Sequence, residues 1–287
     1  MFARTTRRRF FAAFGGLRYN SAMRRSIIFL KRSEMAETGK NHEAIKKAVL
    51  LLSELAKKSG PSGVTELARA LDMPKATVHR ILNILCEDNV AVKAQDGRYR
   101  IGPTVLLWSG GYRYSTAAVE IAAPWLRRLR DATNETVHLC VYNNGAAQYA
   151  DRLDSTQNVT LRWSRLGSEL PLYCTSAGRA ILSMLPQEEL EAYLDSAELA
   201  PRTAKTVTSK EELKKMLARF RVQGYAEEIE ENEDNIRCLG GAITDREGYP
   251  VGAISLTAPT FRFTDGDAAK YGPMIAEFAR EISRQIP

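Results

Sequence analysis

The chain has 287 residues, of which 44% are hydrophobic, and a formal net charge of +7. This length suits two domains, and the hydrophobic fraction excludes a chain too polar to form cores. The charge is uneven, because residues 1–40 carry +8, residues 41–115 carry +4 and residues 116–287 carry −5. A basic N-terminal region favours contact with nucleic acid, whereas an acidic C-terminal region is repelled by it.

The cysteines and the hydropathy pattern exclude several classes of protein. Cys86, Cys140, Cys174 and Cys238 are widely separated and form no C-x-x-C pair, so neither a disulfide framework nor a metal site is indicated. No apolar run reaches the roughly 18 residues of a membrane-spanning helix. We therefore expect a cytoplasmic protein without a membrane partner, metal or cofactor.

Residues 1–40 form a basic extension rich in Arg and Phe, with no acidic residue before Glu34. The pattern is typical of a transit peptide or a membrane-surface segment. We favour a second interpretation, an over-long start ahead of the true one, since Met23 and Met35 follow and Met35 opens a polar lead-in to the first helix. A third is a flexible basic arm that adds nonspecific affinity for DNA.

The segment over residues 41–102 predicts a winged helix-turn-helix. The first helix of this segment is expected to bury one apolar face, made of Ile45, Ala48, Val49, Leu52 and Ala56. A second helix follows from Val64 to Leu71, and Asp72 suits the left-handed backbone that ends many helices. Pro74 suits the start of the next helix near Lys75. Two short helices joined by a tight turn let the second enter a DNA major groove.

The helix from Lys75 has a buried and a polar face. Val78, Ile81, Leu82 and Leu85 are spaced for burial, which turns donor-rich side chains outward. Residues 90–101 then read as a hairpin around an Asp96-Gly97 turn, the wing. The alternative is a solvated face of an ordinary helical domain. The candidate DNA-binding residues are Thr65, Lys75, Thr77, His79, Arg80, Asn83, Lys93, Arg98 and Arg100.

Residues 103–130 are expected to be a linker and a linker helix, the helix running from about Ser115 to Arg130, with a hinge at Gly110-Gly111. The linker is unusually apolar, so it predicts a homodimer matched to a palindromic operator, and a dimer of dimers is compatible with this prediction. The alternative is packing on the chain's own wing. The apolar residues are Leu106, Leu107, Trp108, Tyr112 and Tyr114.

Residues 131–287 predict a mixed α+β domain. Two hairpins are expected, one from Thr136 through an Asn143–Gly145 turn to Ala150, the other from Cys238 through Arg246–Gly248 to Thr257. A further strand is predicted from Asn158 to Trp163. Helices are predicted over residues 177–184, 187–194, 209–223 and 265–285, the third opening on a Ser209–Glu212 capping box.

Three motifs resemble those of the IclR-type transcriptional regulators. The run Glu66–Leu82 is similar to the family's E-L-A-x-x-L-G-L-P-K-S-T-V-H-R-L-L, differing mainly at Asp72, Met73 and Ala76. Pro171–Ala180 resembles P-L-H-x-T-A-x-G-K-A, and Gly224–Cys238 resembles the segment before the effector-site cysteine. The resemblance covers residues 41–287, and the departures further along are Tyr173 for His, Glu228 for Asp or Ser, Asn235 for Gly and Ala242 for Pro.

The resemblance implies that the C-terminal domain is GAF-like, with an effector pocket on one face of its sheet. It implies effector contacts at Cys238 and Glu228. Period-two alternation places Ser255 and Thr257 on one strand face. Thr175, Ser176 and Ala177 begin a helix, whose N-terminal N–H groups favour an anion. The expected effector is an organic acid or aromatic catabolite, although a carboxylate at Glu228 repels an anion unless it is protonated or bridged, which favours a neutral or hydroxyl-bearing ligand.

The acidic run Glu227–Asp234 is expected to be a solvated loop, because it lacks the spacing of known metal-binding loops. Catalysis is not expected, since none of His42, His79 and His138 accompanies a nucleophile motif and no P-loop or G-x-G-x-x-G occurs. We therefore predict an operator-binding regulator modulated by a small metabolite. The alternative is a thiol-based redox sensor using Cys238, with Arg237 as the neighbouring cation.

Overall fold

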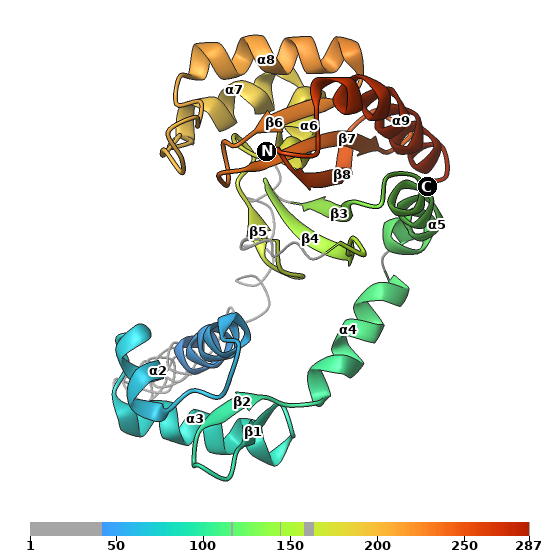
Figure 1. Ribbon diagram of the computed structural model, residues 1–287. Helices are drawn as coiled ribbons and strands as arrows, with labels where there is room; N and C mark the ends of the chain where they lie inside the picture. The colour runs from blue at the N-terminus through green and yellow to red at the C-terminus, as the bar shows by residue number, and fades with distance from the viewer. Residues whose placement is uncertain (1–41, 116, 144, 158–163, 287) are drawn as a thin grey trace, which may run out of the picture. The chain divides into compact units, whose positions relative to one another are not determined.

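The computed structural model describes residues 42–115, 117–143, 145–157 and 164–286 (Figure 1). The basic extension 1–40, the expected strand 158–163 and the side chain of Tyr114 lie outside the described residues. The chain divides into two compact units, Met1–Ser109 and Gly110–Pro287. Each unit has its own hydrophobic core.

The N-terminal unit is a three-helix bundle with a two-stranded wing. A helix over residues 42–57 precedes α2 (Val64–Ala70) and α3 (Lys75–Glu87), and β1 (Ala91–Lys93) pairs antiparallel with β2 (Tyr99–Ile101). The turn between α2 and α3 is as predicted, with Asp72 at φ 49° and Pro74 as the N-cap of α3. Met73 is buried in the turn. The expected helix-turn-helix is confirmed.

Two details of this unit differ from the sequence-based expectation. The helix over residues 42–57 buries Leu51 and Leu55, whereas Ile45 is 64% and Val49 56% exposed. The helix has two apolar stripes, and only one meets the bundle. The wing turn is also longer than a two-residue turn, because Ala94 N–H donates to Arg98 O and Gly97 stands in the left-handed region at φ 78°.

The expected linker is helical. α4 (Thr104–Ser115) contains both Gly110 and Gly111, so the glycines do not interrupt the helix, although the division between the two units falls at Ser109/Gly110. α5 (Ala117–Thr133) follows, and its buried Leu126 and Leu129 join the core of the C-terminal unit.

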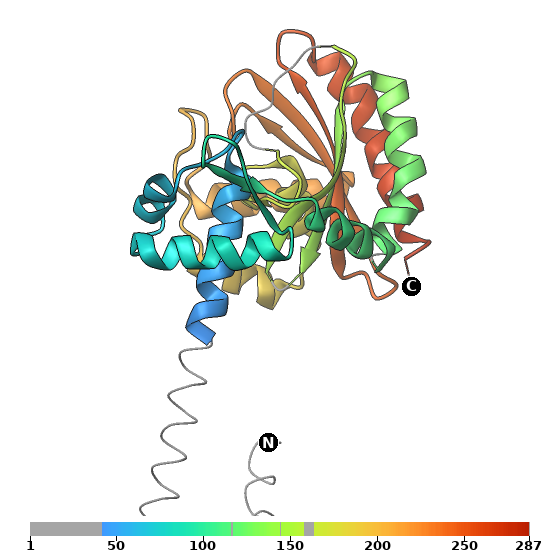
Figure 2. The same ribbon diagram turned by 90° about the horizontal axis from the view of Figure 1, so that it is seen from below.

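The C-terminal unit is a six-stranded antiparallel sheet between two layers of helices (Figures 1 and 2). α5 and α9 cover one face, and α6 and α8 pack over the other with α7. The strand order is β5-β4-β3-β8-β7-β6. The strands are β3 (Thr136–Asn143), β4 (Ala146–Leu153), β5 (Glu169–Leu170), β6 (Ala226–Ile229), β7 (Ile236–Thr244) and β8 (Pro250–Pro259). The remaining helices are α6 (Ser176–Met184), α7 (Gln187–Ser196), α8 (Lys210–Gln223) and α9 (Asp265–Ser283).

The sequence predicted both hairpins of this unit and helices α6, α7, α8 and α9, but it did not predict β5 or β6. The acidic run was interpreted as a solvated loop, yet its first part is strand β6 and Glu228 and Glu231 are buried. At α8 only half of the predicted capping box forms, because Ser209 accepts the N–H of Glu212 without a reciprocal bond. A complete capping box, Thr264 with Asp267, instead starts α9.

Candidate functional site

Helix α3 presents a polar face to solvent. Val78, Ile81 and Leu82 are buried against α2 and the first helix, which fixes the rotation of α3. Thr77 is half-buried on the outer side, and the side chains of Lys75, His79, Arg80 and Asn83 are exposed. Asn83 Nδ2 and His79 Nδ1 are 3.5 Å apart. The predicted outward residues therefore form one donor-rich surface of a helix narrow enough for a major groove.

The wing adds three exposed cations, Lys93, Arg98 and Arg100, and Thr65 is exposed at the start of α2. Lys93 Nζ lies 5.7 Å from the centre of the Tyr99 ring. Arg98 contacts Glu66 at 3.5 Å, and Glu66 is also 3.1 Å from Lys58. Exposed pairs of this kind are weak and exchange readily with other partners. The wing cations thus remain available to phosphates.

The seven residues predicted to bind an effector line a single cavity of about 30 Å³ in the C-terminal unit. They come from the start of α6 and from β6, β7 and β8. The structure therefore brings together segments that lie more than 80 residues apart in the sequence. The predicted residues are Thr175, Ser176, Ala177, Glu228, Cys238, Ser255 and Thr257, and the other lining residues are His138, Tyr149, Ser164, Asn232, Glu233 and Ile236.

Strand register aligns the floor of this cavity, called here the Cys238 cavity. Glu228 pairs with Cys238 across β6 and β7, and Cys238 pairs with Thr257 across β7 and β8. In the next row, Ser255 pairs with His138 of β3. Side chains two residues apart on a strand share a face, so both rows point to the same side of the sheet.

The N-terminus of α6 forms the opposite wall. Thr175 is its N-cap and accepts the N–H of Gly178 at 3.1 Å, while its hydroxyl donates to Pro171 O at 2.6 Å. A Cβ on Gly240 would lie 2.5 Å from the Ser176 carbonyl carbon, so glycine lets the helix approach the sheet. The first N–H groups of a helix have no hydrogen-bond partner within the helix. Ser176 and Ala177 are the first residues of α6 and line the cavity, so such N–H groups lie at the cavity wall.

Glu228 is buried at the wall formed by β6. Its Oε1 accepts the N–H groups of Glu231 at 2.5 Å and Asn232 at 3.1 Å. Burial raises the pKa of Glu228 from 4.5 to about 7, although these hydrogen bonds oppose the rise. The Glu228 carboxyl group therefore titrates near neutral pH.

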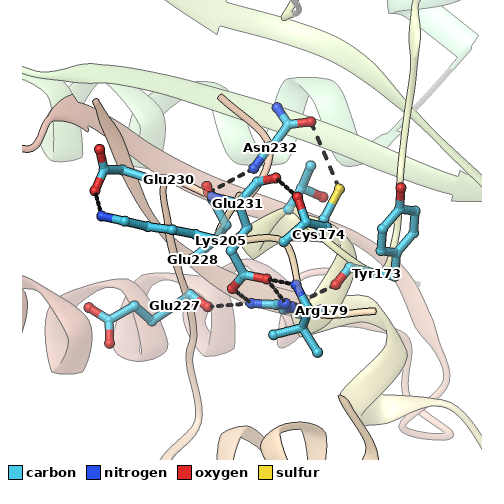
Figure 3. Close-up of polar contacts among 12 residues, drawn as sticks. Tyr173, Cys174, Arg179, Lys205, Glu227, Glu228, Glu230, Glu231 and Asn232 are labelled. Carbon is cyan, nitrogen blue, oxygen red and sulfur yellow. Dashed lines mark hydrogen bonds and ion pairs between the residues drawn. The ribbon is translucent and has the colours of Figure 1, made fainter. Parts of the chain in front are cut away.

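A buried ion pair holds the loop that follows Glu228 (Figure 3). Arg179 of α6 is fully buried and donates to both carboxylate oxygens of Glu231, at 2.5 and 2.6 Å. Arg179 Nε also donates to Tyr173 O at 2.7 Å, and Val207 N–H donates to Glu231. Because Glu231 N–H bonds Glu228, the pair fixes the position of the cavity carboxyl.

His138 lies in the same cavity and was not predicted as a site residue. Its Nδ1 is 3.4 Å from Ser255 Oγ, and its Nε2 is buried without a hydrogen-bond partner among the described residues. Burial, aided by nearby Arg152, lowers the pKa of His138 to about 3, so the ring is neutral. A neutral imidazole with one unpartnered nitrogen offers a polar contact to a molecule in the cavity.

The thiol of Cys238 is not set up as an activated nucleophile. Its Sγ donates to Thr257 Oγ1 at 3.3 Å. Burial, and then the neighbouring Glu228, raises the pKa of Cys238 well above its usual value. Arg237, the cation that the sequence offered as an activator, is bound to Glu227 at 2.6 Å and Asp265 at 2.8 Å.

A second hollow of about 650 Å³ lies at the C-terminal ends of α6, α8 and α9. It is lined by Arg221, Arg246, Arg280 and Arg284. Three of these arginines stand at or beyond the last turn of α8 or α9, where a positive charge stabilises the helix end. The smaller cavity differs from this hollow because buried polar groups converge on it.

Two further findings concern the described residues only. No group of three or more His, Cys, Asp or Glu side chains is arranged to hold a metal ion there. Within the same ranges, no helix has the length and apolarity that crossing a membrane requires.

Comparisons with known proteins agree on one family. Residues 44–93 match the model of the IclR helix-turn-helix domain, and residues 112–284 match that of the bacterial transcriptional regulator IclR C-terminal domain. The regulator KdgR of Escherichia coli K12 is 32% identical over 227 residues, which cover 78% of this chain and 85% of KdgR.

Solved structures share the fold. The IclR structure of Thermotoga maritima has a TM-score of 0.72 and 32% identity, covering 85% of this chain and 99% of that one. An IclR homologue from Microbacterium hydrocarbonoxydans, complexed with 4-hydroxybenzoate, has a TM-score of 0.71 and 22% identity. It covers 85% of this chain and 98% of that one.

Proposed function

Because this chain belongs to the IclR family of DNA-binding transcriptional regulators, we propose that it binds one operator sequence and that a small organic molecule in the Cys238 cavity changes its affinity for that operator. The observation that carries this proposal is the convergence of seven predicted residues, from four elements, on one cavity. The protein then acts as a binding protein, not an enzyme, and binds double-stranded operator DNA in the cytoplasm.

We assign operator contact to the segment 41–102. The exposed side chains of Arg80, Lys75 and Asn83 on α3 match the donors that read guanine and adenine edges. The wing cations are suited to phosphates or the minor groove. Residues 103–130 lead from this segment into the effector-binding domain, residues 131–287, whose core is joined by buried residues of α5.

The effector class is an organic acid or aromatic catabolite. Support comes from the N-terminus of α6, which offers N–H groups to an anion, and from the hydroxyls of Ser255 and Thr257. The 4-hydroxybenzoate complex of the Microbacterium homologue is consistent with this class. No cofactor or metal is needed.

A homodimer is part of the proposal, and pairing of dimers is compatible with it. On α4, Leu106 and Leu107 are 72% and 75% exposed, and Trp108 is 52% exposed. The second apolar stripe of the helix over residues 42–57, Ile45 and Val49, is also exposed. Large apolar side chains gathered on solvent-facing helices mark a surface for association.

Redox sensing through Cys238 is the competing function. The raised pKa of the thiol and the engagement of Arg237 disfavour it. If Cys238→Ser abolished release of the operator by peroxide, the redox function would replace the metabolite function.

The proposal is tested by selecting bound sequences from a random pool of DNA duplexes with the full chain. We expect one sequence with two-fold symmetry, its half-sites about 34 Å or a multiple of this apart. Recovery of no preferred sequence would contradict operator recognition. The selected duplex then serves to measure release by candidate acids.

A further inference from the structure

Among the described residues, the lining of the Cys238 cavity contains carboxyl groups but no Lys or Arg. The carboxyl groups are those of Glu228 and Glu233. The nearby cations of the described residues have acidic partners, because Arg179 binds Glu231, Lys205 binds Glu230, Arg237 binds Glu227 and Arg152 binds Asp154. His138 is uncharged. An anion that enters therefore meets the buried Glu228 carboxyl without a compensating side-chain charge from the described lining.

Within the described lining, it is the N-terminus of α6 that offers an anion positive potential. A helix N-terminus carries roughly +0.5 of a charge, which offsets one carboxylate only in part. Two carboxylates held close together in a buried site cannot both stay ionised, and the pair retains one proton. An organic acid and Glu228 thus form such a pair whenever the acid binds.

We propose that an organic acid binds in the Cys238 cavity together with one proton, which Glu228 holds against the ligand carboxylate, while His138 Nε2 contacts a second oxygen of the ligand. This inference rests on the proposed function, because it specifies the effector of that same cavity. The ionised Glu228 of the free protein takes the proton from solvent, so atoms and charge balance.

Three observations support these details. The cavity is small, about 30 Å³, which suits a short acid such as glycolate or lactate as the probe. His138 Nε2 is buried and unpartnered within the described chain. Burial raises the pKa of Glu228 to about 7, so the surroundings already disfavour the charge of this one carboxylate.

Calorimetry measures proton uptake directly. Glycolate and lactate are titrated into the full chain at pH 5.5 and 8.5, in two buffers that differ in ionisation enthalpy, with glycolamide and lactamide as uncharged matches. We expect close to one proton taken up per acid bound at pH 8.5 and close to none at pH 5.5. Above pH 7 the Kd of the acids should rise about tenfold per pH unit.

The variants separate this inference from the proposed function. Glu228→Gln should bind the acids with a flat pH profile and no proton uptake, and the matched change Glu277→Gln, on the exposed surface of α9, should behave as the wild type. His138→Phe should weaken lactate at least tenfold at both pH values while leaving the pH profile unchanged.

Several results would overturn the inference. These are no uptake by the wild type at pH 8.5, equal uptake by Glu228→Gln, binding of the amides in preference to the acids, or no binding of either acid at pH 5.5. None of them removes operator recognition, which the DNA selection tests. If Ser255→Val with Thr257→Val leaves acid binding intact, the ligand lies elsewhere and the proposed cavity itself is wrong.

Discussion

At the scale of single residues, two departures from the family motifs have a backbone explanation. Asp72 and Asn235 both stand where the motif has Gly, and both adopt left-handed φ values, 49° and 62°. Asp and Asn tolerate this region better than other residues with a side chain. The substitutions therefore preserve the helix turn and the β6–β7 loop, whereas Glu228 alters the chemistry of the site.

Glu228 should make the stability of the effector domain fall as the pH rises. Its pKa is raised from 4.5 to about 7 in the folded chain. Between these values the folded state keeps a proton that the unfolded state releases, so the free energy of unfolding falls as pH rises from about 4.5 to about 7, then levels. The total loss is about 3 kcal/mol. Thermal unfolding of Glu228→Gln, compared with the wild type at pH 5 and pH 8, should lack this loss, and an unchanged pH dependence would contradict it.

Removing one member of the Arg179–Glu231 pair should lower stability strongly, whereas replacing both should cost less than the sum of the two single losses. Arg179→Met leaves a buried carboxylate without its cation, and Glu231→Met leaves a buried guanidinium, each lowering stability by about 3–5 kcal/mol. The double variant removes both charges, so its loss should be smaller than the sum. Denaturant unfolding of all four proteins measures the coupling, and additive losses would show that the pair acts independently.

At the scale of elements, the local sequence pattern predicted most helices and hairpins, but it did not predict how strands pair or which helix face packs. β6 was missed because Ala-Glu-Glu-Ile has low strand propensity, and its strand form depends on pairing with β7. The first helix was given the wrong buried face because two apolar stripes compete there and only tertiary packing decides between them. His138 was missed for the same reason, since its partner Ser255 is 117 residues away.

On α3, Lys75→Ala and Arg80→Ala should each weaken operator binding by about 1–3 kcal/mol if the side chains contact bases. Neither side chain has a structural role, because both are exposed, so the melting temperature should not change. Fluorescence anisotropy with the selected duplex measures the affinity. Lys215→Ala, an exposed cation on α8, is the control. Unchanged affinity in both test variants would remove α3 from the groove.

At the scale of the whole molecule, the exposed apolar residues of α4 should hold two copies together. Leu107→Glu with Trp108→Glu places charges on this surface, and we expect the sedimentation coefficient to fall to that of a monomer with the folds intact. Val222→Glu alters a side chain that is 90% exposed on α8 and should leave the assembly unchanged. If the double variant sediments as the wild type, this part of α4 is not the interface.

The last prediction concerns coupling between the effector and the operator. A ligand changes DNA affinity only if it binds the DNA-competent and DNA-incompetent arrangements with different free energies, and such couplings are typically about 1–3 kcal/mol. By reciprocity, the selected operator must change the affinity for lactate by the same factor by which lactate changes the affinity for the operator. Ser255→Val with Thr257→Val replaces two hydroxyls of the cavity floor and should abolish both effects, while basal operator binding persists because α3 is untouched. Titrating each ligand in the presence and absence of the other measures the two factors. Unequal factors would show that the two titrations do not report the same binding equilibria, and a normal response of the double variant would place the effector outside this cavity.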